Sequence, residues 1–429
     1  MRFKIILILG VVFGILVFII FRFLAPLLFD KTVEKIGETG RYSATNLPTS
    51  ILELVGDGLT KIDSEGIPQP SLAKSWESTD NGKTWTFHLR EDAHWQDKTK
   101  VTSADISYNF EDVQIKKPDN NTVVFTLASP FTPFPGVVSR PVFKKGLLGT
   151  GEWKVSDLSV TGNYVQSLTL VDKDGNKKIF KFYPTEDRVK LAYKLGEIDV
   201  IDELIDPSPF NTNSWKTSEL EPLTDNQRYV GVFFNTLDDN LKDKNLRQAL
   251  AYAINKEALG FKRAYGPLSP ASWAYNPQVK PYDFDVARAK ELINDSKQLS
   301  DEQKKNLKIK LVTTLPLLPI AEKVANDWKA IGVATTVSVT QSVPSDFQAF
   351  LAMYDIPSDP DQYSTWHPQG AENITHYTNT RIGKLLEDGR MEIDQEKRKK
   401  IYLDFQRYLV EDAPVAFLYH PITYKLVRK

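Results

Sequence analysis

A polar and aromatic segment near the end of the chain holds the residues best suited to contact a ligand. Its members are Asp359, Asp361, Tyr363, Trp366 and His367. A carboxylate can pair with a cationic group that has lost its water, and aromatic faces can cover a ligand without specifying its sequence. The same residues also fit a solvated turn, because Asp-Pro-Asp is common in loops. The residues alone favour the solvated turn.

A serine-based acyl-enzyme is a second possible chemistry. Ser71-Leu72-Ala73-Lys74 and Ser107-Tyr108-Asn109 are similar to the Ser-x-x-Lys and Ser-x-Asn boxes of penicillin-binding proteins. The third box, Lys-Thr-Gly, does not occur in the sequence, and Ser71 opens a predicted strand-turn-strand block. We therefore expect no enzyme activity.

Metal chemistry is weakly indicated. Cysteine is absent, which removes disulfides, thiolate metal sites and a lipoprotein anchor but does not identify the compartment. The five histidines lack the spacing of a metal-binding helix: His88, His94, His367, His376 and His420. His367 and His376 leave a nickel-chelate site open. We expect neither a bound metal nor another cofactor.

Length and composition exclude several classes. At 429 residues the chain needs at least two domains besides an anchor. Hydrophobic residues make up 41% and charged residues 25%, as in a folded globular protein. Lys plus Arg number 54 and Asp plus Glu 55, so no general positive field favours nucleic acid.

Residues 1–30 predict a single transmembrane anchor. An uncharged run extends from Ile5 to Phe21 after Arg2 and Lys4, and about twenty helical residues cross a bilayer core of roughly 30 Å. A cleaved signal peptide would have a shorter apolar region and small residues at its cleavage site, which Leu24-Ala25-Pro26 matches poorly. Positive charges flank this run on both sides, so the positive-inside rule gives little indication of how the helix is oriented in the membrane.

The centre of the chain predicts a buried strand followed by an amphipathic helix. Residues 229–235 are mostly apolar and β-prone. In residues 245–259, apolar side chains recur at helical spacing, and Gly260 is placed to end the helix.

The same order of elements is predicted on both sides of this centre. Strands 180–183 and 198–201 flank a helix over 186–195, and strands 307–313 and 333–339 flank a helix over 320–331. A strand, a helix and a strand in so few residues indicate a parallel crossover. The earlier region predicts a hairpin over 72–90, a helix capped by Thr102–Asp105 that runs to Val113, and a strand over 122–127.

Two blocks of sequence resemble the family 5 extracellular solute-binding proteins, the peptide and nickel binders of ABC importers. The first is Phe-Phe-Asn-Thr at 233–236 with Leu-Arg-Gln-Ala-Leu-Ala-Tyr-Ala-Ile-Asn-Lys-Glu-Ala-Leu at 246–259. The second extends from Leu72 to Phe110 and includes His94-Trp95-Gln96-Asp97. The resemblance implies an α/β, two-lobed clamshell of the periplasmic-binding-protein type (type II, cluster C-like). Lobe 1 would be residues 40–230 with 417–429 returning to it, and lobe 2 would be residues 231–416.

The resemblance also implies a ligand and a site. In peptide-binding members an aspartate of the Asp-Pro segment pairs with the ligand's terminal ammonium, a role that falls on Asp359. Trp273 and Tyr275 lie in a segment that resembles a loop at the cleft, although core packing explains them equally well. The implied function is to bind oligopeptides outside the cytoplasm and deliver them to an ABC permease, with the chain anchored in the cell membrane.

Other functions stay open at this point. A nickel-chelate or sugar binder would share the fold, and a signalling or adhesion ectodomain would need no permease. The family often has a tryptophan shortly before the Asp-Pro motif, where this sequence has Met353-Tyr354.

Overall fold

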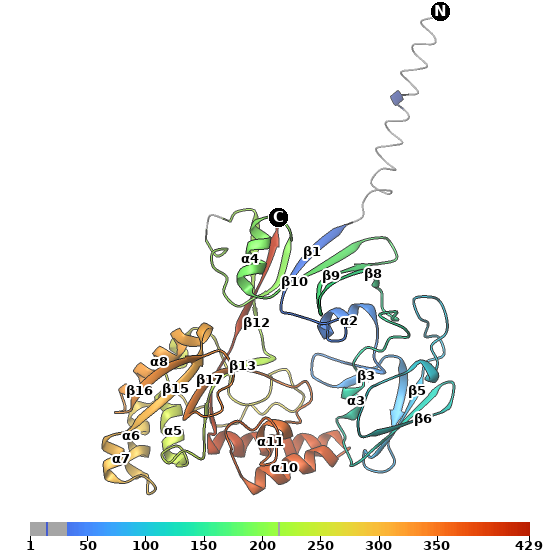
Figure 1. The fold of residues 1–429 in the computed structure, drawn as a ribbon. Coiled ribbons are helices and arrows are strands. Elements are labelled where there is room, and N and C mark those ends of the chain that lie inside the picture. Colours follow the sequence, from blue (N-terminus) through green and yellow to red (C-terminus); the bar gives the residue numbers. More distant parts are fainter. Residues whose placement is uncertain (1–13, 16–31, 213–214) are drawn as a thin grey trace, which may run out of the picture.

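The computed structural model describes residues 14–15, 32–212 and 215–429. In this part of the chain no helix combines the length and the hydropathy needed to span a membrane. The predicted anchor, residues 1–30, falls almost wholly outside the described residues, so it stays a prediction. The described elements form two groups, which we call the N-terminal half (32–224 with 422–429) and the C-terminal half (228–420) (Figure 1).

The N-terminal half contains a seven-stranded mixed sheet in the order β12-β19-β11-β1-β10-β9-β8. Its strands are β1 (Val33–Thr39), β8 (Lys154–Thr161), β9 (Tyr164–Val171), β10 (Lys177–Tyr183), β11 (Val200–Leu204), β12 (Ser218–Thr224) and β19 (Ile422–Arg428). Helices α2 (Thr49–Val55) and α4 (Glu186–Lys194) contribute buried residues to its core clusters.

A four-stranded antiparallel sheet, in the order β4-β5-β7-β6, completes this half with its own aromatic core. Its strands are β4 (Ala73–Glu77), β5 (Thr84–Leu89), β6 (Val113–Asp119) and β7 (Thr122–Leu127). Near this sheet lie a short hairpin, formed by β2 (Thr60–Ile62) and β3 (Pro68–Pro70), and helix α3 (Phe134–Val137).

The C-terminal half is built on a six-stranded mixed sheet in the order β14-β18-β13-β17-β15-β16. Its strands are β13 (Arg228–Phe234), β14 (Lys262–Arg263), β15 (Lys308–Thr314), β16 (Ala334–Thr340), β17 (Ala349–Asp355) and β18 (Val415–His420). Its helices are α5 (Lys244–Ala253), α6 (Val286–Asp295), α7 (Asp301–Lys305), α8 (Leu318–Lys329), α9 (Tyr363–Trp366), α10 (Thr380–Met391) and α11 (Gln395–Asp412). A single large hydrophobic cluster joins these elements.

The chain crosses between the two halves at two adjacent places. Strand β12 leads to β13 through residues 225–227, and β18 leads to β19 through Pro421. The backbone N–H of Asp225 donates to the carbonyl of Pro421 at 2.9 Å, so the two connections lie side by side. The lobe boundaries expected from the sequence, 230/231 and 416/417, instead fall within the paired central strands β13 and β18.

Most of the predicted elements are present. The parallel crossovers β10-α4-β11 and β15-α8-β16 are confirmed, as are the hairpin β4-β5 and strand β7. The prediction of a helix after Thr102 is wrong. Thr102 N–H and Oγ1 both donate to Asp105 at 2.9 Å, but only a 3₁₀ turn over Ser103–Asp105 follows. Ile106 and the aromatic residues after it alternate along an extended chain, where Tyr108 and Phe110 stack on each other.

The central helix is shorter than predicted. Helix α5 ends at Ala253, and a separate 3₁₀ turn over Glu257–Leu259 is closed by Gly260 at φ +78°. The fully buried Lys256 explains the break, because its Nζ donates to the carbonyls of Ala251 and Tyr282. A lysine ammonium that donates to the last carbonyls of a helix takes the place of the backbone N–H groups of a further turn, so the helix can end there.

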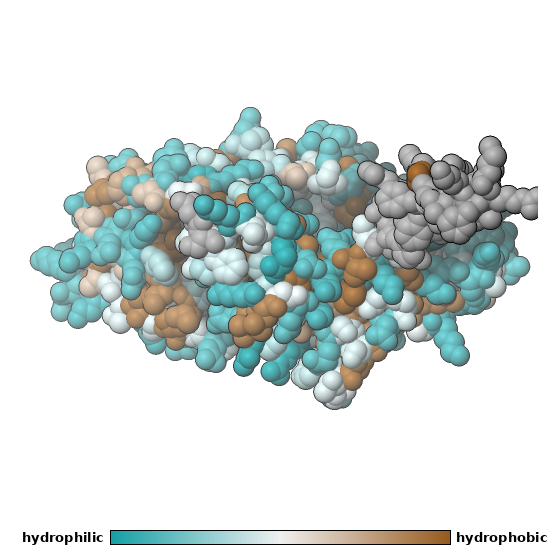
Figure 2. All heavy atoms as spheres, turned by 90° about the horizontal axis from the view of Figure 1, so that it is seen from above, coloured by the Kyte–Doolittle hydropathy of each residue, from teal (hydrophilic) through white to brown (hydrophobic). Residues whose placement is uncertain are grey.

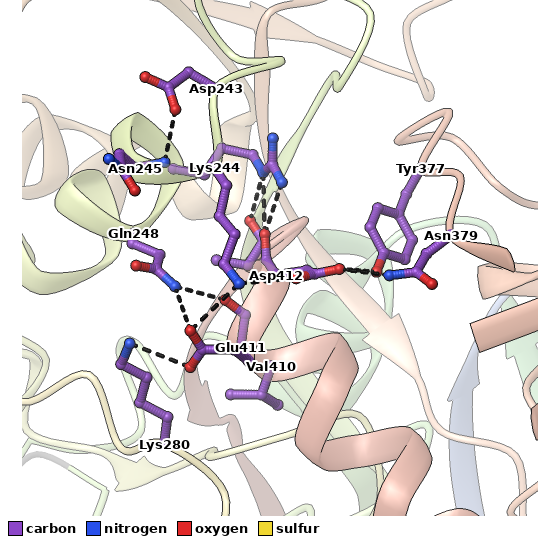
Figure 3. Close-up of polar contacts among 12 residues, drawn as sticks. Asp243, Lys244, Asn245, Gln248, Lys280, Tyr377, Asn379, Val410, Glu411 and Asp412 are labelled. Carbon is purple, nitrogen blue, oxygen red and sulfur yellow. Dashed lines mark hydrogen bonds and ion pairs between the residues drawn. The ribbon is translucent and has the colours of Figure 1, made fainter. Parts of the chain in front are cut away.

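A buried arginine joins the start of α5 to the end of α11. The guanidinium of Arg247, 5% exposed, donates to the carbonyls of Leu241, Lys242, Asp412 and Ala413 at 2.8–3.3 Å. Figure 3 shows the polar contacts around this joint, in which Lys244 also pairs with Glu411 and Asp412. The charged hydrogen bonds compensate the burial of the arginine and hold α11 where it leads into β18.

We predict that Arg247→Met lowers the free energy of unfolding by about 2–4 kcal/mol, because four buried carbonyls lose their charged donor. Urea denaturation of the purified protein measures this. Lys242→Met is the matched control, since its ion pair with Asp239 is exposed and should matter by less than about 1 kcal/mol. Equal loss in both variants would show that the joint does not contribute to stability.

Candidate functional site

A cavity of about 490 Å³ lies between the two halves. We call it the tryptophan cavity because Trp76, Trp85 and Trp273 line it. The N-terminal half contributes Ile67, Pro68, Trp76, Glu77, Ser78, Trp85, Thr132 and Pro135, and the C-terminal half contributes Trp273, Asp359, Glu392, Ile393, Gln395 and Arg398. Its volume lies within the roughly 300–1,000 Å³ typical of small-molecule sites. Two of the seven residues singled out in the sequence, Asp359 and Trp273, are in its wall.

Asp359 is paired with an arginine. Arg398, on the first turns of α11, donates from Nη1 to Oδ2 at 2.8 Å and from Nη2 to Oδ1 at 2.6 Å. Asp359 Oδ1 also accepts the backbone N–H of Asp361 at 2.9 Å. A carboxylate offers about four acceptor positions, so one position, on Oδ2, is left for another donor. The arginine is buried and its Nε donates to the carbonyl of Gly389 at 2.8 Å.

Asp361 and Tyr363 both contact Arg390, behind the wall of the tryptophan cavity. Arg390 Nε donates to Asp361 Oδ2 at 2.8 Å, and the guanidinium carbon lies 4.0 Å from the centre of the Tyr363 ring. Burial raises the pKa of Asp361, and the nearby positive charge of Arg390 opposes this rise. These residues fix the conformation of the Asp-Pro segment.

The remaining predicted residues lie away from the lining of the tryptophan cavity. Trp366 is fully buried, donates from Nε1 to Gln362 at 2.8 Å and stacks on Phe233 in the core. His367 is buried against the Tyr363 ring, with Nε2 3.4 Å from Glu387. Tyr275 is half-buried against the core of the C-terminal half. No group of three His, Asp or Glu suited to a metal ion occurs in the described residues.

The two halves touch directly beside the cavity. The N–H of Trp273 donates to the carbonyl of Glu65 at 3.0 Å, and the N–H of Thr132 donates to that of Arg390 at 2.7 Å. Gly66 has φ +88°, and a Cβ added there would overlap the carbonyl oxygen of Ser358. Glycine is therefore needed for this close approach.

A second cavity of about 390 Å³ lies beside the crossings. We call it the acidic cavity, and its charged lining residues are Glu38, Glu186, Glu203, Asp355 and Arg228. Arg228, the first residue of β13, contacts Glu203 of the N-terminal half and Asp355 of the C-terminal half, the latter at 2.8 Å. One arginine faces four carboxylates, so the cavity has a surplus of negative charge.

Sequence reasoning missed Arg398, Arg228 and the acidic residues of the second cavity. Arg398 is one of several cations in the run Glu-Lys-Arg-Lys-Lys at 396–400, and nothing in that run distinguishes it. Its position on the inward face of α11, four residues before the buried Tyr402, was the available signal. Glu38 and Asp355 are distant in sequence, so only the fold brings them together.

We predict that Glu38 makes stability fall as the pH rises from about 4.5 to about 7. Burial, then Asp202 and Glu203, raises the pKa of Glu38 from 4.5 to about 7. In this window the folded state holds a proton that the unfolded state has released, so stability decreases as the pH rises. The loss of stability is complete above pH 7. Glu38→Gln should therefore gain about 1–3 kcal/mol relative to the natural protein between pH 5 and pH 8 in urea denaturation. Glu219→Gln, at a position whose side chain is 56% exposed, serves as the control, and a difference independent of pH would contradict the assignment.

Comparisons with known proteins agree on one family. The model of the bacterial extracellular solute-binding proteins, family 5 (middle), matches residues 68–374. Di/tripeptide-binding protein 1 of Pseudomonas aeruginosa is 25% identical over 88% of this chain and 85% of its own length. The nickel-binding periplasmic protein of Escherichia coli is 24% identical over 86% of this chain and 84% of its own.

The fold has close counterparts among solved structures. The ABC transporter substrate-binding protein CtaP of Listeria monocytogenes superposes with a TM-score of 0.77 at 22% identity, covering 93% of this chain and 94% of that one. The matched family consists of transport binding proteins rather than enzymes. With a family match over most of its length and the same mixed α/β fold, this chain belongs to the family 5 extracellular solute-binding proteins.

Proposed function

We propose that this chain is the substrate-binding component of an ABC importer, and that it takes oligopeptides into the space between its two halves. The observation that carries the proposal is the tryptophan cavity, because both halves line it and touch beside it. A ligand held there contacts both halves at once. Such a ligand favours the arrangement in which they approach each other.

The chemistry of the cavities favours a peptide. A peptide has a cationic end, a backbone of donors and acceptors, and side chains of mixed polarity. The acidic cavity and the last acceptor position of Asp359 suit the cation, and the tryptophans cover apolar parts. Relatives named as di/tripeptide-binding and oligopeptide-binding proteins support this choice.

A nickel chelate is the second candidate. It is favoured by the nickel-binding relative and by a similar structure described in complex with Ni(L-His). His367 of the original nickel hypothesis is buried beside Glu387, and His376 lies in the following loop. Binding assays must therefore include the nickel–histidine complex.

Within the site, we propose direct ligand contacts for Asp359 and Trp273, and a supporting role for Asp361, Tyr363, Trp366, His367 and Tyr275. Closure would be a hinge motion of the two halves, the lobes expected from the sequence. Residues 225–227 and Pro421 are the connections that such a motion would use.

We predict that Asp359→Asn weakens tri-alanine binding at least about tenfold, because the ligand ammonium loses a charged acceptor while the shape of the side chain is kept. Isothermal titration calorimetry measures the change. Small-angle scattering of the natural protein should show a smaller radius of gyration with the peptide.

Asn is preferred to Ala because removing Asp359 altogether would leave the buried Arg398 guanidinium unpaired and could cost several kcal/mol of stability. Asp404→Asn, an exposed position on α11, is the matched control. Unchanged affinity in Asp359→Asn would remove the ligand role of Asp359, and binding of nickel–histidine in place of every peptide would favour the second candidate.

We further propose that residues 1–30 anchor the chain in the cell membrane with the rest outside the cytoplasm. The uncharged run from Ile5 to Phe21 supports this, as do relatives named as periplasmic proteins. The expected result is a carbonate-resistant membrane fraction in which external protease degrades the C-terminal part. Deletion of residues 1–30 should abolish membrane retention, whereas retention of the deleted form would overturn the proposal.

A further inference from the structure

We propose that the tryptophan cavity is a pocket for a peptide side chain that carries a cationic group on an apolar stem, as lysine and arginine do. This inference rests on the proposed function and adds a preference among substrates. It follows from the types of residue that line the cavity and from the way their charges are already paired.

The walls suit an apolar stem. Trp76 is half-buried and stacks on Phe87, with ring centres 6.1 Å apart and ring planes inclined by 28°, so Phe87 supports it from behind. Trp85 is held by hydrogen bonds from Nε1 to the carbonyls of Gly82 and Phe131 at 3.0 and 3.2 Å. Trp273 contacts the Arg398 guanidinium and the Tyr402 ring. Rigid aromatic walls bury methylene groups and attract a cation placed over a ring.

The charges of the lining leave a negative surplus. Arg398 and Asp359 form an ion pair through two hydrogen bonds, so together they add no net charge to the lining. The other charged lining residues are Glu77 and Glu392. Glu77 Oε1 lies 3.7 Å from His88 Nε2. The Glu392 carboxylate accepts the backbone N–H of Asp394 at 2.9 Å.

The two glutamates come from different halves. Glu77 ends β4 in the N-terminal half, and Glu392 directly follows α10 in the C-terminal half. Bringing the halves together around the cavity moves two like charges toward each other. A cationic side chain between them offsets this repulsion, whereas a glutamate side chain would add to it. The expected order of affinity is therefore lysine or arginine, then norleucine, then glutamate.

The test compares tripeptides that differ only at the middle residue: Ala-Lys-Ala, Ala-Nle-Ala and Ala-Glu-Ala. All three carry the same terminal ammonium, so a difference between the first two isolates the side-chain charge. Calorimetry with the full-length protein should show about tenfold tighter binding of the lysine peptide than of the norleucine peptide. Raising the salt concentration should reduce this preference, because both glutamates are partly exposed to solvent.

The variants Glu392→Gln and Glu77→Gln/Glu392→Gln locate the charge. Glutamine keeps the acceptor oxygen for the Asp394 N–H, so the loop after α10 should be unchanged. The lysine preference should fall to about threefold in the single variant and vanish in the double variant. Norleucine affinity should not fall in either variant, because removing a glutamate charge relieves the repulsion that a neutral side chain leaves in place. Glu396→Gln, an exposed glutamate on the first turn of α11 outside the cavity lining, is the matched control.

Each outcome decides one question. Equal binding of the lysine and norleucine peptides, or a full preference retained in the double variant, overturns the pocket assignment and leaves peptide binding standing. Failure of every tripeptide to bind, with a folded protein by circular dichroism, overturns the proposed function and with it this inference.

Discussion

The structure depends on one constraint of chain connectivity, which is that the backbone passes between the two sheets at two neighbouring points. The hydrogen bond from Asp225 to Pro421 places these connections side by side. Strands β13 and β18 then pair within the six-stranded sheet, while β12 and β19 pair within the seven-stranded sheet. Since both connections are short, the halves can move relative to each other without breaking either sheet.

The two cavities between the halves use their charges differently. In the tryptophan cavity, the main ion pair joins Asp359 and Arg398 of the same half and stabilises one wall. In the acidic cavity, Arg228 contacts carboxylates of both halves, and so it links their positions. A change in the separation of the halves therefore alters the surroundings of Arg228 directly and leaves the Asp359–Arg398 pair intact.

Buried polar side chains also explain one of the two sequence blocks that resemble the family 5 proteins. In Leu-Arg-Gln-Ala-Leu, the arginine and the glutamine line neither of the two cavities. Arg247 donates to four backbone carbonyls. Gln248 donates to Glu411 at the end of α11 (Figure 3). The strongest sequence signal thus reports the packing of the scaffold.

The face of the molecule in Figure 2 is mainly hydrophilic, with hydrophobic residues in small groups.

Elements whose periodicity is local could be predicted from the sequence, because alternation and helical spacing depend on neighbouring residues. Strand β7, the unit β15-α8-β16 and the strand at 228–234 are examples. It misjudged the stretch after Thr102, where a capping box precedes extended aromatic residues. It singled out Asp359 and Trp273, which line the tryptophan cavity, but not Arg398, which contacts both.

Which charges meet depends on the three-dimensional fold. Asp359 and Arg398, or Glu38 and Asp355, are far apart along the chain, and their proximity follows from sheet order and from the double crossing. The same holds for Trp366, whose sequence neighbours suggested a ligand contact and whose burial against Phe233 places it in the core. Burial and pairing are properties of long-range packing, which no local pattern of residues contains.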